Sequence, residues 1–70
     1  MNAAELIKLI KYKGQLSQTE IANEVGCTQV TISRLKRNCC IPNYKNATNL
    51  ILLAKRYNIK VTLTDLLPLD

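Results

Sequence analysis

The sequence contains no histidine, tryptophan or phenylalanine, and its few carboxylates are not clustered. Without histidine, the serine and cysteine side chains have no neighbouring base to activate them for nucleophilic catalysis. A glycine-rich loop that would cradle a phosphate is also absent from the sequence. We therefore expect neither an enzyme nor a cofactor site.

Three cysteines do not make a disulfide framework or a metal site. Their count is odd, and Cys39 and Cys40 are adjacent, which is poor geometry for pairing with each other. A zinc site needs about four ligands, and no histidine supplies the fourth. This cysteine usage fits a reducing compartment. We expect Cys27 in the core, and Cys39 and Cys40 as structural residues of a loop.

Long apolar runs are missing as well. The longest uncharged apolar stretch falls far short of a membrane span, and residues 1–13 are amphipathic and charged, unlike a leader peptide. We therefore expect no membrane partner and a cytoplasmic location. Seventy residues allow a single domain, 1–70, which buries only about 60% of its unfolded surface. With 47% hydrophobic residues but no Phe or Trp, the core must be aliphatic.

Acidic residues are absent from Val25 to Thr64, although the net charge of the whole chain is only +5. The basic residues of that stretch are Arg34, Lys36, Arg37, Lys45, Lys55, Arg56 and Lys60. Such a one-sided field favours a polyanion as the partner. The alternative is a basic surface that serves only solubility.

Residues 18–37 are the best-defined stretch of the chain, and they predict two short helices around a tight turn. Ser17 and Glu20 form a capping box in front of the first helix. Gly26 stands where a residue with positive φ is needed to stop that helix. Thr28 is placed to cap the second helix. The apolar residues that two steeply crossing helices must bury between them are Ile21, Val25, Cys27, Ile32 and Leu35.

This pattern is that of a helix-turn-helix, and it resembles the Cro and repressor proteins of temperate phages. The resemblance covers about twenty positions, from Ser17-Gln-Thr-Glu-Ile-Ala through Gly26 to Gln29-Val-Thr-Ile-Ser-Arg-Leu35. It implies a phage or prophage origin and a place of action in the cytoplasm of a bacterial host. The alternative is an αα-hairpin that only forms part of a small helical bundle.

Periodicity and capping residues predict the remaining helices, and with them an all-α, compact five-helix bundle of the lambda-repressor-like type. The predicted helices are residues 3–13, 18–25, 28–37, 47–57 and 63–67. Gly14 is expected to end the first helix, Asn46 to cap the fourth, and Thr62 with Asp65 to cap the fifth. A strand over Ile59–Leu63 is the competing interpretation, because its β-branched residues favour one.

The outward face of the helix over residues 28–37 carries the candidate residues for reading DNA bases. Ile32 and Leu35 fix the inward direction. At about 100° per residue, the outward positions are then Val30, Ser33, Arg34 and Arg37, with Gln29 and Lys36 beside them and Thr28 at the N-terminal tip. Gln pairs with adenine, Arg pairs with guanine, Val packs on a thymine methyl, and Ser or Thr serves several base edges. The predicted base contacts are Thr28, Gln29, Val30, Ser33 and Arg34.

Phosphate contacts are expected around this helix. Lys36 and Arg37 lie near its end, where a recognition helix leaves the groove floor. The resemblance implies that Gln18, at the first turn of the preceding helix, grips the DNA backbone. It also implies that the loop over residues 38–46 runs along the sugar-phosphate backbone. The candidates there are Asn38, Tyr44, Lys45 and Asn46.

The sequence therefore predicts a DNA-binding transcriptional regulator, a Cro-like repressor that binds a palindromic operator as a weak homodimer strengthened on DNA. Half-sites would lie about 34 Å apart, and no small-molecule ligand is expected. The predicted dimer surface is Ile41–Asn43, Tyr57–Ile59 and Leu66–Leu69, although the C-terminal leucines equally fit a monomer core. A protein-interaction module of the antitoxin or anti-repressor type and a non-specific DNA-compacting protein are the alternatives.

Overall fold

The computed structural model describes residues 2–39 and 41–67, which form one compact body measuring 33 × 25 × 18 Å. Its five helices are α1 (Ala3–Gly14), α2 (Gln18–Val25), α3 (Gln29–Lys36), α4 (Tyr44–Arg56) and α5 (Leu63–Leu66). The described part of the chain contains no strand, so the all-α prediction is confirmed and the strand over Ile59–Leu63 is wrong. None of these helices is long and apolar enough to cross a bilayer.

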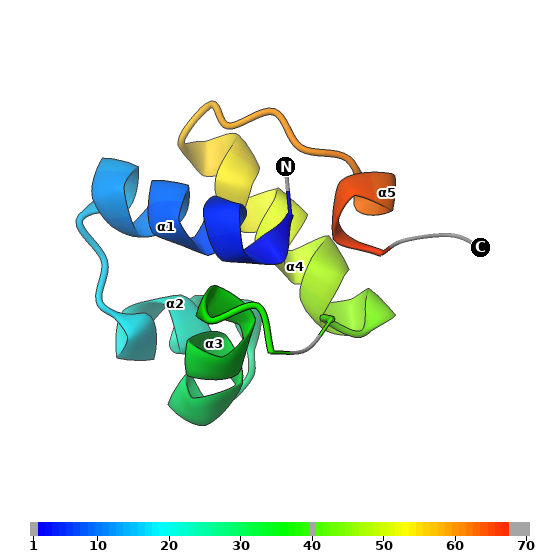
Figure 1. Cartoon of the computed structure of the whole chain (residues 1–70). Coiled ribbons are helices and arrows are strands. Elements are labelled where there is room, and N and C mark those ends of the chain that lie inside the picture. Colours follow the sequence, from blue (N-terminus) through cyan, green and yellow to red (C-terminus); the bar gives the residue numbers. More distant parts are fainter. Residues whose placement is uncertain (1, 40, 68–70) are drawn as a thin grey trace.

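The helices enclose a single aliphatic core. In Figure 1, α2 and α3 lie together on one side of α1, whereas α5 packs at the other end of the molecule against α4. α1 contacts both α3 and α4, which places it behind the α2–α3 pair. The largest fully buried side chains are Leu6, Ile7, Ile10, Ile21, Val25, Ile32, Leu35 and Leu50. No polar or charged residue is buried among the described ones.

Side-chain caps begin four of the helices. Ser17 Oγ accepts from the N–H of Glu20 at 3.2 Å, and Glu20 Oε1 accepts from the N–H of Ser17 at 3.1 Å, so the capping box is confirmed. Asn2 Oδ1 accepts from the N–H of Glu5 in α1. Thr28 Oγ1 accepts from the N–H of Thr31 in α3. Each of these bonds satisfies a backbone donor that the helix leaves unpaired.

The prediction that α4 begins at residue 47 behind Asn46 is wrong. Asn43 is the cap: its Oδ1 accepts from the N–H of Asn46 at 2.7 Å, and α4 starts at Tyr44. Pro42 disfavours helix only at the residue before it, so it leaves Asn43 free to initiate one. Tyr44, Lys45 and Asn46 therefore belong to the first helical turn and not to a loop.

Gly14 does not stop α1 by adopting positive φ. It is the last helical residue, and Gln15 takes the left-handed conformation with φ 52°. A Cβ on Gly14 would lie 2.7 Å from Cζ of Tyr57, so the glycine gives room to that ring. Gly26, by contrast, has φ 86° and ends α2 as predicted.

Asn38 and Asn58 end α3 and α4 in the same left-handed conformation, with φ 60° and 58°. The residue after each asparagine donates its N–H to the carbonyl five residues earlier. Cys39 donates to Arg34 and Ile59 donates to Ala54, each at 3.0 Å. This is the Schellman arrangement, which satisfies carbonyls at a helix C-terminus. Asparagine tolerates it better than other non-glycine residues.

Candidate nucleic-acid interface

The exposed face of α3 brings together most of the predicted base contacts. Gln29, Val30, Ser33, Arg34 and Arg37 line one shallow hollow on the surface. Val30 is 55% exposed and has no apolar cover on this otherwise polar face. Ile32 and Leu35, on the opposite side of α3, are at most 1% exposed. They fix α3 against the core, while its outer side stays open to solvent.

Gln29 is held in place by Gln18. Gln29 Nε2 donates to Gln18 Oε1 at 2.7 Å, which links the first turn of α3 to the first turn of α2. The amide of Gln29 thereby keeps its oxygen and one N–H for another partner. A side chain already fixed by a neighbour loses less rotamer freedom when it binds, so this bond prepares Gln29 for recognition.

Two of the predicted base contacts also have structural tasks within α3. The Thr28 hydroxyl caps the helix and lies 3.0 Å from the Thr31 hydroxyl. The Ser33 hydroxyl accepts from Nη2 of Arg37 at 3.2 Å, and Ser33 is half-buried. A hydroxyl offers one donor and two acceptor sites, so each has capacity left for a base edge. Arg34 is exposed.

The predicted phosphate contacts do not form one cluster. Gln18 is half-buried at the start of α2, whereas Tyr44 and Lys45 are exposed in the first turn of α4. The N–H of Asn46 is taken by the Asn43 cap. Asn38 is exposed, and its position is explained by the left-handed turn that ends α3. Arg37 is exposed at the end of α3, next to the hollow.

Lys36 lies away from that hollow, on the side of α3 that faces α1. Lys36 is half-buried, and its pKa lies below the ordinary lysine value. The largest cause is the positive charge of Lys11. Lost hydration and the charge of Lys8 lower the pKa of Lys36 further. Sequence reasoning missed Lys8 and Lys11, because their spacing on α1 shows only that they share a solvent-facing side.

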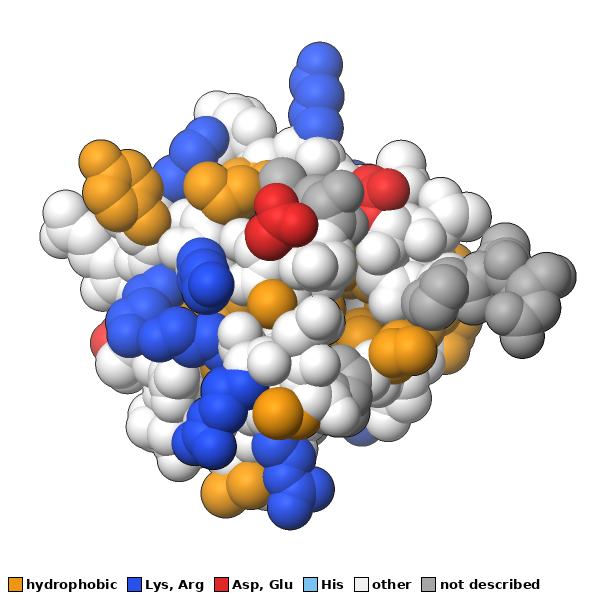
Figure 2. All heavy atoms as spheres, in the orientation of Figure 1, with side chains coloured by type: hydrophobic (Ala, Val, Ile, Leu, Met, Phe, Trp, Pro, Cys, Tyr) orange, Lys and Arg blue, Asp and Glu red, His pale blue; other side chains and the backbone are white. Residues whose placement is uncertain are grey.

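Figure 2 shows lysine and arginine side chains gathered on one side of the molecule, over α1 and α3. Of the acidic side chains on α1 and α2, Glu20 accepts from the Ser17 N–H in its capping box, Glu24 forms an ion pair with Arg56 at 3.0 Å, and Glu5 is exposed on α1. The described lysines and arginines of α1 and α3 form no ion pair, so this face keeps its positive charge.

The cysteines contribute little to this face. Cys27 packs half-buried against the core in the turn between α2 and α3, and burial raises the pKa of its thiol. The thiol of Cys39 is exposed and donates to the Arg37 carbonyl at 3.8 Å. The prediction for Cys40 lies outside the described residues. No group of three or more potential metal ligands occurs in the described part.

The predicted dimer surface divides into exposed and buried parts. Ile41 is 61% exposed, whereas Ile59 and Leu66 are buried in the monomer core and are not available to a partner. Tyr57 is half-buried against Gly14. The structure thus assigns Leu66 to the core of the single chain, which was one of its two expected roles. Leu69 lies outside the described residues.

Comparisons with known proteins do not extend this description: no protein-family model matches the sequence, and no curated protein or solved structure is significantly similar to it.

Proposed function

We propose that this protein is a sequence-specific DNA-binding regulator that uses α2 and α3 as a helix-turn-helix. The proposal rests on two features of α3: the side chains on its exposed face, and the packing of its other side against the core. It combines amide, hydroxyl, guanidinium and aliphatic groups on a helix whose other side is buried in the core. A helix of this kind fits the major groove, where each base pair presents a distinct pattern of donors, acceptors and methyl groups.

In this proposal, the N-terminal half of α3 lies deepest in the groove. Gln29, fixed by Gln18, pairs with an adenine, and Val30 packs beside it on a thymine methyl. Arg34 reaches a guanine or a phosphate, one turn further along. Arg37 and the first turn of α4 contact the flanking backbone and set the register.

The charge distribution supports a polyanionic partner over a protein partner. The α3 face and its surroundings carry several arginines and lysines that form no ion pair within the described chain. A protein-interaction module of the same fold has no need for this excess. A purely compacting protein needs positive charge alone and not the mixture of Gln29, Val30 and Ser33. Operator binding by a Cro-like repressor accounts for both features.

The test is selection of bound sequences from a random duplex pool at physiological salt, with the native protein and with Gln29→Ala. We expect the native protein to enrich a palindrome. The variant should lose its preference at one base position in each half-site, by about 1–3 kcal/mol. Gln15→Gly is the matched control, since Gln15 lies outside the α3 face, and it should enrich the native sequence.

Other outcomes separate the alternatives. Binding at low salt with no enriched sequence would assign the protein to non-specific compaction. Absence of binding to any duplex would favour a protein partner, and the regulator proposal would then fail.

A further inference from the structure

Three lysines from two helices converge on one patch beside the α3 face. Lys8 and Lys11 stand three residues apart on α1, which places them on the same side of that helix. Lys36 comes from the last turn of α3, which packs directly against α1. The positive charge of Lys11, and less strongly that of Lys8, lowers the pKa of Lys36, as expected where two packed helices bring ammonium groups to one side. We call Lys8, Lys11 and Lys36 the α1–α3 lysine patch.

Among the described residues, no acidic side chain forms an ion pair with these lysines. Glu5 and Glu20, the acidic residues of α1 and of the first turn of α2, form no ion pair with these lysines, and Glu24 is paired with Arg56. Like charges held together destabilise the free protein. The same arrangement becomes favourable when an anion lies over it, because one phosphate then attracts several ammonium groups.

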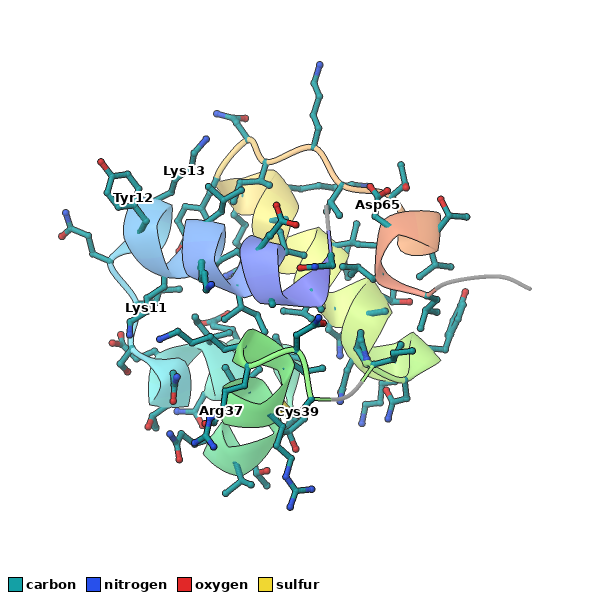
Figure 3. All side chains as sticks on the ribbon, in the orientation of Figure 1. Lys11, Tyr12, Lys13, Arg37, Cys39 and Asp65 are labelled. Atoms are coloured by element: carbon teal, nitrogen blue, oxygen red, sulfur yellow. The ribbon has the colours of Figure 1, made fainter. Side chains whose placement is uncertain are left out.

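The position of the patch shows which part of a ligand it would meet. In Figure 3, Lys11 lies on the side of α1 that faces α2 and α3, whereas Lys13 projects from the opposite side. Arg37, at the end of α3, is next to Lys36 in sequence and lines the α3 hollow. Figure 2 shows the basic side chains continuing from α1 to α3 over this region. The patch is therefore contiguous with the proposed base-reading face but lies outside it.

We propose that the α1–α3 lysine patch is a second phosphate-binding surface, which holds the backbone of the DNA duplex beside the groove that α3 enters. This inference rests on the proposed function. A lysine ammonium is a point charge on a flexible stem and lacks the planar fork of arginine, so the patch binds phosphate without reading bases. It adds affinity and salt sensitivity, and leaves the choice of sequence to α3.

The experiment compares Lys11→Gln with Lys13→Gln. Both variants lose one positive charge from the C-terminal half of α1, and the two lysines lie on opposite sides of that helix. The affinity of each protein for its selected duplex, and for a random duplex, is measured over a range of salt concentrations. We expect Lys11→Gln to weaken both affinities equally and to make the plot of log affinity against log salt shallower by about one. Lys13→Gln should leave that slope unchanged.

Thermal melting of the free protein provides the second readout. Because Lys11→Gln relieves repulsion with Lys36 but also removes a favourable charge from the last turn of α1, it should leave the melting temperature close to the native value while it weakens binding to DNA. A variant that merely destabilises the fold would lower both the melting temperature and the affinity for DNA. Equal slopes for Lys11→Gln and Lys13→Gln would overturn the inference and leave the proposed function intact. A change in base preference in Lys11→Gln would overturn it too. Failure of the native protein to bind any duplex would remove both proposals.

Discussion

At the scale of single residues, the left-handed turns explain several positions that look functional or neutral in the sequence. Asn38 and Asn58 end helices in a conformation that asparagine tolerates, and their neighbours complete the hydrogen bonds of the turn. Gln15 has the same conformation, with φ 52°, but lacks the short side chain that makes asparagine suitable. It is therefore a strained residue at the end of α1.

This strain predicts the effect of Gln15→Gly. The variant should be more stable by about 0.5–1 kcal/mol, because glycine avoids the left-handed cost of about 1–2 kcal/mol but loses more chain entropy on folding. Urea denaturation measures the difference. Lys13→Gly, two residues earlier inside α1, is the control and should destabilise by about 1 kcal/mol. Destabilisation by Gln15→Gly would show that the glutamine side chain stabilises the turn.

At the scale of elements, the α2–α3 pair is stabilised from outside as well as by its own contacts. Asn49, half-buried on α4, donates from Nδ2 to the Val25 carbonyl at 2.8 Å, at the point where α2 ends. Gly26 and Cys27 direct their N–H groups to the Ala22 carbonyl at 2.8 and 3.0 Å. The turn between the two helices is thus held from both sides, which keeps α3 at a fixed angle to the rest of the domain.

The carboxylate of Asp65 caps the start of the short α5. The Thr62 N–H donates to Asp65 Oδ2 at 3.1 Å, and this hydrogen bond lowers the pKa of Asp65 below its usual value of 3.8. The stabilisation is present above the unfolded pKa and is lost as the pH falls through the lowered, folded-state pKa. α5 also supplies Leu66 to the core, so its loss affects the whole fold.

Asp65→Ala should therefore lower the melting temperature at neutral pH. The difference from the native protein should begin to shrink as the pH falls below 3.8, where the unfolded state takes up the proton, and should be smallest below the lowered pKa of the folded-state carboxyl. Melting followed by circular dichroism at a series of pH values measures this difference. A gap that stays constant down to the most acidic sample would contradict the assignment of α5 stability to the ionised carboxylate.

At the scale of the whole molecule, two of the exposed apolar residues flank the segment between α3 and α4, where the sequence predicts part of the dimer surface. Ile41 and Tyr44 are 61% and 68% exposed, and both lie near the loop that joins these helices. Burial of Ile41 against a second copy is favourable, whereas Tyr44 belongs to the first turn of α4, which is proposed to contact the DNA backbone. A module of this size contacts few base pairs, so a proposed palindromic operator calls for two copies.

Ile41→Ser should weaken self-association by about 1.5–3 kcal/mol for each Ile41 that becomes buried in the dimer. Sedimentation equilibrium with the proposed operator duplex measures it, because the native dimer is expected to be weak without DNA. Leu52→Ser is the control: Leu52 is 55% exposed on α4 but lies beside Glu24 and Arg56, outside the predicted dimer surface. Equal stoichiometry and affinity for Ile41→Ser and native protein would exclude Ile41 from the interface.

The sequence by itself determined the features that depend on bonds within a few residues. The capping box of Ser17 and Glu20, the stop at Gly26, and the aliphatic stripes of α1 to α4 follow from local hydrogen bonding and helical period. The same reasoning placed the start of α4 three residues late. Asn43 and Asn46 are both acceptable caps, and the sequence does not show which side chain finds its backbone donor.

Only the tertiary structure decided what depends on the packing of one helix against another. The contact between α1 and α3 brings Lys36 beside Lys11, and the crossing of α2 and α3 joins Gln18 to Gln29. Packing of α5 against α4 placed Leu66 in the core of the single chain. Helical periodicity fixes the direction of a side chain on its own helix. Which neighbour it meets depends on how the shared core closes, and that is set by the whole set of buried side chains at once.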